Sequence, residues 1–128
     1  VTAGRDHRIR LWNTSTGKNT NKHYPRVDNI YQKKIKMGIS AMTKQPLVFC
    51  PSRSDIVVLD VYRGTVEKKL QGHYSMVHAC VFHPTMHEMY SGSNDEEVLV
   101  WTPPEPHDSL EAGGGGGARR RAAAGRPE

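Results

Sequence analysis

Three side chains in the second half of the chain have the types that nucleophilic catalysis needs. Ser91, His73 and Asp95 could supply a hydroxyl nucleophile, its general base and the acid that orients the base. The sequence has no Gly-x-Ser-x-Gly elbow around this serine and no oxyanion loop, and the pattern recurs near the N-terminus. We therefore interpret these residues as structural, predict no catalytic residue and expect that the protein is not an enzyme.

A second group of side chains has ligand types for zinc. Cys80, His83 and His87 lie close in sequence, and His78 could add a fourth ligand. The paired spacing of zinc sites is absent, however, and Cys80 alternates with its neighbours on an expected strand that ends before Pro84. We interpret the cysteine as a small buried residue and expect neither a metal site nor a cofactor.

The positive charge of the chain is concentrated in one stretch. The chain carries a net charge of +5, and residues 18–44 alone hold seven Lys or Arg against one acid. Tyr24 and Tyr31 lie among these lysines, a combination found in readers of single-stranded nucleic acid. A solvated loop is the favoured interpretation, direct nucleic-acid binding is not expected, and contact with an acidic partner is the alternative. The candidate partner-binding residues are Lys18, Lys22, Arg26, Lys33, Lys34 and Lys36.

Short β-rich segments separated by turn residues recur along the chain. No helical periodicity is present, so the sequence predicts an all-β fold. With only two cysteines there is no disulfide framework, which favours a reducing compartment. No apolar run approaches the roughly 20 residues of a membrane span, and no membrane partner is expected. The expected strands cover 9–12, 35–42, 47–50, 56–62, 66–70, 77–82, 89–93 and 98–101.

Two stretches of the sequence align without gaps. Residues 2–6 match residues 91–95, and in each a tryptophan follows the aspartate by six positions: Trp12 after Asp6, and Trp101 after Asp95. The copies lie 89 positions apart, which fits two repeats of about 44 residues. The intermediate copy is degenerate, with Arg53 at the aspartate position and Leu59 at the tryptophan position, although Gly17 still aligns with Gly64.

Gly72-His73, twenty-nine positions before Trp101, completes a pattern that resembles the WD-repeat family of β-propellers. The resemblance implies a hydrogen-bonded chain that runs from the turn aspartate through the histidine and a strand hydroxyl to the tryptophan. It assigns these roles to His73, Ser91, Asp95 and Trp101, and to Thr2, Asp6 and Trp12 in the first copy. The Gly-His of that copy would lie upstream of Val1, so we expect a piece of a longer protein.

The expected architecture is about two and a half blades of a seven-bladed propeller, followed by a tail. After Trp101 two prolines interrupt the strand pattern, so no fourth strand of the last blade is recognisable. The Gly-, Ala- and Arg-rich composition beyond them favours a low-complexity, disordered tail. The expected divisions are a partial propeller over 1–102 (blade end 1–20, degenerate blade 35–73, last blade 77–102) and the tail over 103–128.

Segments 9–20, 70–82 and 88–95 also resemble the Cockayne syndrome group A family, over about residues 1–103. The resemblance implies a nuclear, non-catalytic substrate receptor of a cullin-4 RING ubiquitin ligase. It would dock on the damaged-DNA-binding protein 1 adaptor, with repair or transcription proteins as clients, in transcription-coupled nucleotide excision repair. The tail departs from the acidic, serine-rich tail of that family, so it is either a genuine difference or a splice or gene-model variant. The alternative is a generic WD-repeat interaction scaffold unrelated to DNA repair.

Many such receptors carry a Trp-Asp-x-Arg motif after the third strand of a blade. Here Trp12 is followed by Asn13, Trp101 is followed by Thr102, and Asp60 lacks a preceding tryptophan. The motif is therefore not present in this sequence, and we expect that adaptor contacts lie elsewhere in the protein.

Overall fold

The computed structural model describes residues 1–29, 34–40 and 44–103 and the backbone of 118–122. Every regular element in this part of the chain is a β-strand, which confirms the all-β prediction. No helix in the described part is long and apolar enough to cross a membrane. The strands are Thr2–Ala3 (β1), Ile9–Arg10 (β2), Gly38–Ile39 (β3), Leu47–Ser52 (β4), Asp55–Asp60 (β5), Val66–Gln71 (β6), Val77–Phe82 (β7), Met89–Ser93 (β8), Glu97–Trp101 (β9) and Ala118–Ala122 (β10).

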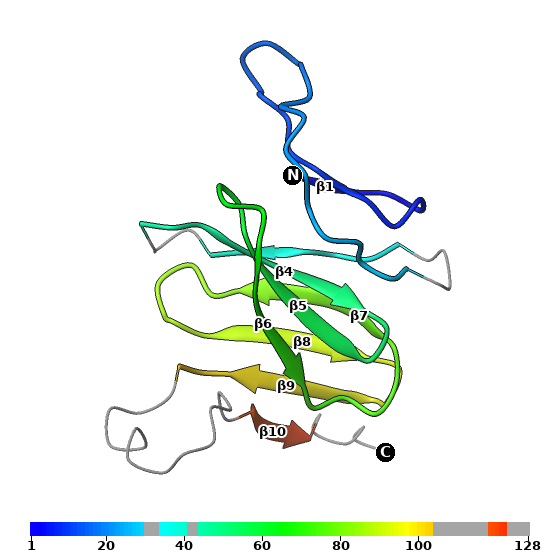
Figure 1. The fold of residues 1–128 in the computed structure, drawn as a ribbon. Coiled ribbons are helices and arrows are strands. Elements are labelled where there is room, and N and C mark those ends of the chain that lie inside the picture. Colours follow the sequence, from blue (N-terminus) through cyan, green and yellow to red (C-terminus); the bar gives the residue numbers. More distant parts are fainter. Residues whose placement is uncertain (30–33, 41–43, 104–117, 123–128) are drawn as a thin grey trace.

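The strands form three stacked antiparallel sheets, which we call the first, middle and last blades (Figure 1). The first blade is the β1–β2 pair. The middle blade has the order β3-β4-β5-β6, and the last blade has the order β7-β8-β9-β10. Because each blade follows sequence order, β3 and β7 lie at corresponding edges of two neighbouring sheets. This is the arrangement of consecutive blades in a propeller.

The two central strands of the middle blade, β4 and β5, are largely buried because they are apolar on both faces, whereas β6 is polar and mostly exposed. Along β4, Val48 and Cys50 point into a core shared with the first blade, and Phe49 points toward the last blade. Ile56 of β5 belongs to this second core, which also contains Trp101. The β-branched run of β5 therefore holds three sheets together, and its residues are almost fully buried.

The middle and last blades are also joined through their backbones. The Lys36 N–H donates to the carbonyl of His78 at 2.8 Å, and the Cys80 N–H donates to the Lys36 carbonyl at 2.9 Å. A side chain at Gly38 would place its Cβ 3.1 Å from the Cys80 carbonyl oxygen, so glycine permits the close approach. The expected strand over 35–42 is correspondingly short: β3 is limited to Gly38–Ile39, and residues 41–43 lie outside the described part.

The last blade has a fourth strand that the sequence did not indicate. β10 pairs antiparallel with β9, with Ala118 opposite Trp101 and Ala122 opposite Glu97. Nothing in the composition of 103–128 indicates a strand after Trp101, and the structure adds one over these five residues. The two prolines end β9, and backbone pairing at the open edge of β9 does not require an apolar sequence. Residues 104–117 and 123–128 lie outside the described part.

Candidate functional site

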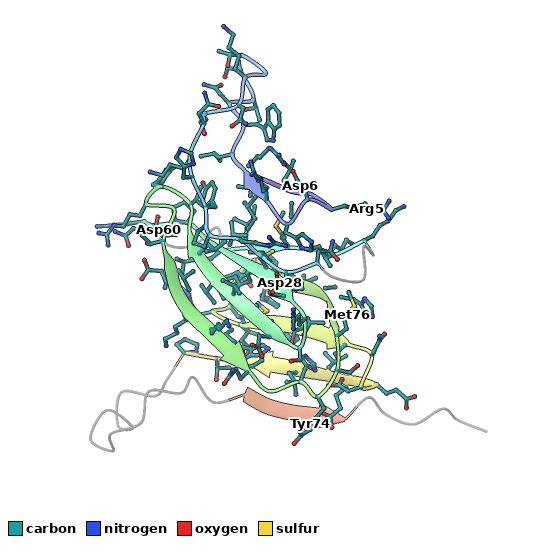
Figure 2. All side chains as sticks on the ribbon, turned by 45° about the vertical axis from the view of Figure 1, so that its right-hand side comes forward. Arg5, Asp6, Asp28, Asp60, Tyr74 and Met76 are labelled. Atoms are coloured by element: carbon teal, nitrogen blue, oxygen red, sulfur yellow. The ribbon has the colours of Figure 1, made fainter. Side chains whose placement is uncertain are left out.

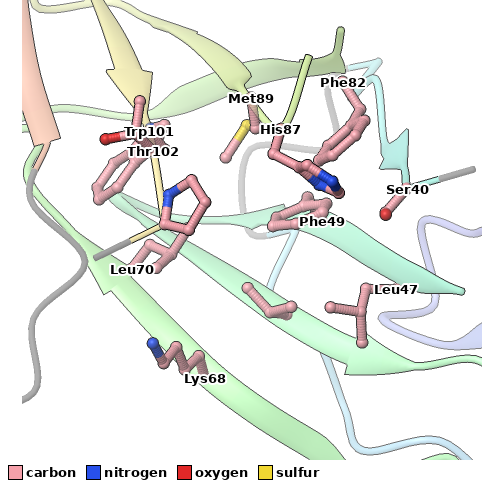
Figure 3. Close-up of a pocket in the computed structure, with 12 residues that line it drawn as sticks. Ser40, Leu47, Phe49, Lys68, Leu70, Phe82, His87, Met89, Trp101 and Thr102 are labelled. Carbon is pink, nitrogen blue, oxygen red and sulfur yellow. The ribbon is translucent and has the colours of Figure 1, made fainter. Parts of the chain in front are cut away.

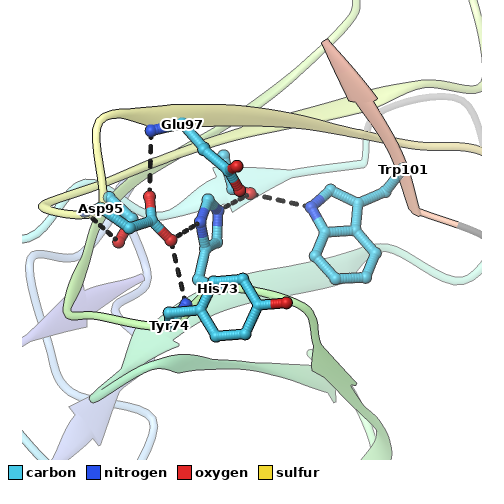
Figure 4. A network of polar contacts seen from close by, with 7 residues as sticks. His73, Tyr74, Asp95, Glu97 and Trp101 are labelled. Atoms are coloured by element: carbon cyan, nitrogen blue, oxygen red, sulfur yellow. Dashed lines mark hydrogen bonds and ion pairs between the residues drawn. The ribbon is translucent and has the colours of Figure 1, made fainter. Parts of the chain in front are cut away.

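The structure brings together the four residues assigned to the last repeat. The ring of His73 contacts Asp95 Oδ2 through Nδ1 at 2.9 Å and Ser91 Oγ through Nε2 at 2.7 Å. The indole N–H of Trp101 donates to the same Ser91 Oγ at 2.8 Å (Figure 4). The side chain of His73 has no exposed surface, and Ser91 is 1% exposed. These four side chains form a continuous buried chain, which we call the His73 network.

Strand register explains why the network closes. Ser91 lies opposite Leu99 and Met89 lies opposite Trp101, so these side chains share one face of the last blade. Gly72 lets the linker from β6 to β7 lie against this face, because a Cβ there would sit 3.0 Å from Leu99 Cδ1. The glycine and the histidine of the Gly-His pair therefore have separate roles: close packing and polar bonding.

The turn at Asp95 anchors the exposed end of the network. Its carboxylate accepts hydrogen bonds from the backbone N–H groups of Tyr74 and Glu97, both at 3.0 Å. Burial raises the pKa of Asp95, but donation by the Tyr74 N–H, the His73 ring and the Glu97 N–H outweighs burial and lowers the pKa to about 2. The carboxylate is therefore charged at neutral pH and fixes the histidine and two turn amides.

The distances among Ser91, His73 and Asp95 would suit a nucleophile, a base and an orienting acid. Their burial does not, because a substrate carbonyl could not reach the Ser91 hydroxyl without opening the interface between two blades. That hydroxyl also accepts the bond from Trp101. In this structure Ser91, His73 and Asp95 stabilise the fold, and the Ser91 hydroxyl is not accessible to a substrate.

The first copy of the motif is only partly assembled. The Trp12 indole N–H donates to Thr2 Oγ1 at 2.8 Å, as in the last blade. Asp6 does not join them: its carboxylate forms an ion pair with Arg10 at 2.6 Å, and 47% of its side chain is exposed. Trp12 is 41% exposed. The structure therefore connects two of the three predicted residues and leaves the third on the surface.

The middle copy reveals a residue that the sequence comparison missed. Leu59 is buried at the tryptophan position, and Arg53, at the aspartate position, adopts a positive φ of 56° in the β4–β5 turn. Asp60 is 1% exposed, and its carboxylate accepts from the backbone N–H groups of Tyr62 and Arg63, both at 2.8 Å. Asp60 therefore closes the turn from β5 to β6.

A signal for Asp60 was present in the alignment of Gly17 with Gly64. That alignment also places Asn13 against Asp60, and the Asn13 side chain accepts from Ser15 N–H at 2.9 Å in the equivalent turn. The two glycines have φ values of 69° and 73°, a region that strongly favours glycine. The turn after the third strand is thus repeated more faithfully than the tryptophan before it.

The residues considered as zinc ligands have separate partners. Burial raises the pKa of the Cys80 thiol to about 12, with a smaller contribution from Cys50, so the buried thiol is protonated at neutral pH. His83 accepts from the backbone N–H of Met86 at 3.0 Å, and His78 contacts Asn94. Within the described residues no group of three or more potential ligands could hold a metal ion.

The basic stretch is not a uniform solvated loop. Lys18, Lys22 and Arg26 are exposed, in accord with that interpretation, whereas Val27 and Asn29 are buried. Burial follows from bonds to His7, whose carbonyl accepts from the Val27 N–H at 3.2 Å and whose ring accepts from the Asn29 N–H at 2.9 Å. Lys34 and Lys36 are exposed beside the inner strand β7, and Lys33 lies outside the described residues.

An apolar cavity of about 250 Å³ opens between the middle and last blades (Figure 3). Phe49 and Phe82 stack across it with ring centroids 5.8 Å apart, and Trp101 closes one side. Lys68 and His87 are the charged or titratable side chains that line it. The two blades therefore do not fill the whole space between them.

Stacked four-stranded blades with a buried Asp-His-Ser-Trp chain define part of a WD-repeat β-propeller. Residues 64–102 match the family described as WD domain, G-beta repeat. Two solved structures share the fold: "Structure of U3-55K" (TM-score 0.63, 22% identity) and "Crystal structure of RRP9 WD40 repeats" (TM-score 0.64, 23% identity). Each covers 78% of this chain, and this chain covers 31% and 30% of them, respectively.

Curated relatives are WD-repeat proteins or cullin-associated factors. The chain is 32% identical over 103 residues to the WD repeat-containing protein ATCSA-1 of Arabidopsis thaliana, covering 80% of this chain and 22% of that protein. It is 41% identical over 51 residues to the DDB1- and CUL4-associated factor 11 homolog of Caenorhabditis elegans, covering 40% of this chain and 9% of that protein. The chain thus spans a small part of each relative.

Proposed function

We propose that the protein is a non-catalytic substrate receptor of a cullin-4 RING ubiquitin ligase. The observation that carries the proposal is similarity to DDB1- and CUL4-associated factor 11 homologs, at 41% identity in Caenorhabditis elegans and 43% in Caenorhabditis briggsae. Their names state an association with the DDB1 adaptor and the cullin. The similarity covers 40% of this chain and 9% of the Caenorhabditis elegans relative.

The geometry supports a protein that holds two partners. Tyr74 is 75% exposed in the linker before β7, at the end of the blades that carries the His73 network. Tyr62 is 67% exposed in the turn after β5, at the opposite end; Figure 2 shows its neighbour Asp60 far from Tyr74 and Met76. Exposed tyrosines are frequent energetic centres of protein interfaces. A receptor needs separate surfaces for adaptor and client, and exposed tyrosines at two ends of the blades are compatible with this requirement.

The chemistry of the described residues suits a receptor better than a ligase enzyme. A catalytic ligase needs an accessible thiolate or a zinc-bound RING. Cys50 and Cys80 are both buried, and burial raises the pKa of each thiol to about 12. The His73 network is equally enclosed. In the proposed complex these blades position partners, and the transfer of ubiquitin occurs on other subunits.

We further propose that the receptor acts in the nucleus, in transcription-coupled nucleotide excision repair. This part rests on the resemblance of segments 9–20, 70–82 and 88–95 to the Cockayne syndrome group A family. Cells that lack the protein should recover RNA synthesis slowly after ultraviolet damage, and re-expression should restore the rate. Normal recovery would remove the repair role and leave the ligase role to be judged separately.

Affinity purification of the intact protein tests the receptor role. The wild-type protein should co-purify with the adaptor and cullin-4. If the two ends hold different partners, Tyr62→Ser and Tyr74→Ser should each reduce a different set of co-purified proteins. Thr65→Ser, a conservative change in the same turn as Tyr62, is the matched control. Absence of both adaptor and cullin from the wild-type sample would leave a generic WD-repeat scaffold as the function.

A further inference from the structure

Four cationic or titratable side chains from three blades surround one hollow beside the inner strands. Arg5 comes from the β1–β2 turn of the first blade, Lys34 and Lys36 precede β3 of the middle blade, and His78 lies in β7 of the last blade. Figure 2 shows Arg5 extending from its hairpin on the side of the molecule that carries Met76. Residues that are 73 positions apart in sequence therefore meet at a single surface.

Backbone hydrogen bonds between the middle and last blades hold the residues that line the hollow in place. Lys36 is bonded on both sides to β7, through its N–H to the His78 carbonyl at 2.8 Å and through its carbonyl to the Cys80 N–H at 2.9 Å. These bonds set the spacing between the Lys36 and His78 side chains before any ligand arrives. Binding on such a surface does not require the loop ordering that usually lowers affinity.

The charged or titratable side chains among the described residues that line the hollow are all basic. The other described lining residues are Ala3, Ile35 and Ala79, so this part of the lining contains no carboxylate. Asp28, the one acid of the 18–44 stretch, is already paired with Arg26 at 3.6 Å and with Arg53 at 3.4 Å. Lys34 and Lys36 are exposed. The hollow thus combines a positive rim with a small apolar floor.

We propose that this hollow is a docking site for an acidic peptide segment of a partner protein. Carboxylates of the segment would meet Arg5, Lys34 and Lys36, and small apolar residues between them would contact Ala3 and Ala79. Single-stranded nucleic acid normally requires aromatic side chains on which bases stack, and the described lining residues include none. The site does not depend on the ligase role, because a generic scaffold would use the same surface.

The test measures binding of a short fluorescent peptide of alternating glutamate and alanine to the intact protein. Lys34→Glu/Lys36→Glu should weaken binding at least about tenfold, since it removes two attractions and adds two repulsions. Lys34→Gln/Lys36→Gln should give a smaller loss. The matched control is Lys18→Glu/Lys44→Glu, which makes the same charge change at exposed lysines of the same basic stretch that do not line the hollow. The control should bind within about twofold of wild type.

Three results would overturn the proposal. The acidic peptide could bind no better than its glutamine–alanine counterpart, which would show that no acidic site exists. The control Lys18→Glu/Lys44→Glu could weaken binding as much as Lys34→Glu/Lys36→Glu, which would attribute the effect to overall charge. A single-stranded oligonucleotide of matched charge could bind more tightly than the peptide, which would assign the surface to nucleic acid. Melting temperatures of all variants show whether each is folded.

Discussion

The first and last blades contain the same residue types at the same spacing in different surroundings. In the last blade, Asp95 is 8% exposed at its side chain and contacts His73, and Trp101 is 6% exposed. In the first blade, Asp6 is 47% exposed at its side chain and contacts Arg10, and Trp12 is 41% exposed. Both blades have the bond from tryptophan to the strand hydroxyl, at 2.8 Å. Both also have a bond to the aspartate from the backbone N–H two residues later, at 3.3 Å from Arg8 and at 3.0 Å from Glu97.

The difference shows that the motif locates turns and strands, whereas the neighbouring elements determine its energetic value. The same carboxylate stabilises the fold strongly only where a histidine and turn amides surround it in a site closed to water. On the surface it forms an exposed ion pair, which contributes little. Substitutions at matched positions of the two blades can therefore test whether the motif stabilises the last blade more than the first.

The largest contrast is expected at the two tryptophans. Trp101→Ala should lower the free energy of unfolding by about 3–5 kcal/mol, because it empties a buried site between two blades and removes one of the two side-chain partners of Ser91. Trp12→Ala should cost clearly less, since much of that ring already contacts water. Urea unfolding of both variants of the intact protein checks the contrast. Equal losses would mean that the first blade is as well packed as the last.

The next contrast concerns the aspartates. Asp95→Ala should destabilise the protein by about 1–3 kcal/mol, because His73 and the Tyr74 and Glu97 amides lose their acceptor. Asp6→Ala should leave the unfolding midpoint close to that of wild type, because its partner Arg10 can be hydrated instead. Thermal melts of both variants are sufficient to measure this. An unchanged melting temperature for Asp95→Ala would count against the His73 network as a stabilising unit.

The unfolding free energy at low pH should also depend on Asp95 more than on Asp6. The pKa of Asp95 in the folded state is about 2, below its usual value of 3.8, so its contribution is complete above about pH 4 and is lost as pH falls toward 2. The loss should amount to about 2 kcal/mol of unfolding free energy. Asp95→Asn should reduce the decline in stability over this interval, and Asp6→Asn should retain most of it. Equal slopes for wild type and Asp95→Asn would contradict the assignment.

The smallest effect is expected at the hydroxyl of the first blade. Thr2→Val removes the acceptor of the Trp12 indole N–H, but this N–H belongs to an exposed ring that water can reach. The free energy of unfolding should change by less than about 0.5 kcal/mol. Fluorescence of Trp12 should still shift as its hydrogen bond is replaced. A loss larger than 1 kcal/mol, by the usual scale of surface substitutions, would show that the ring is shielded in solution.

The sequence predicted the last blade best, because two separate signals agreed there. Gly72-His73 and the Asp95–Trp101 spacing both indicated the network that the structure forms. The sequence analysis considered Asp60 only for the Trp-Asp-x-Arg motif. Its role in closing the turn was not predicted, because Leu59 replaces the tryptophan that marks this position in the other copies. β10 was not predicted because the strand propensity of its alanine and arginine residues is weak. Its pairing depends on the exposed edge of β9, which no local pattern encodes.

The sequence also could not reveal how the basic stretch divides. Lys18 and Lys36 look equivalent in composition, yet Lys18 projects from a turn of the first blade whereas Lys36 is bonded to β7. Val27 and Asn29, within the stretch, are anchored by His7, a residue that its own neighbours give no reason to select. Contacts between distant segments, and not local charge, decide which lysines can share a ligand.

The hydrogen bonds that join Lys36 to β7 have a consequence for the dynamics of the propeller. Backbone amides within β4–β6 lose their protection when the middle blade unravels. The amides of Lys36 and Cys80 are different, because their acceptors lie in the neighbouring blade. The rate at which they exchange with deuterated solvent therefore reports the separation of two intact blades. This opening motion is distinct from the unfolding of either blade. The exchange rates of these two amide protons thus report how often the propeller opens at the interface between the two blades.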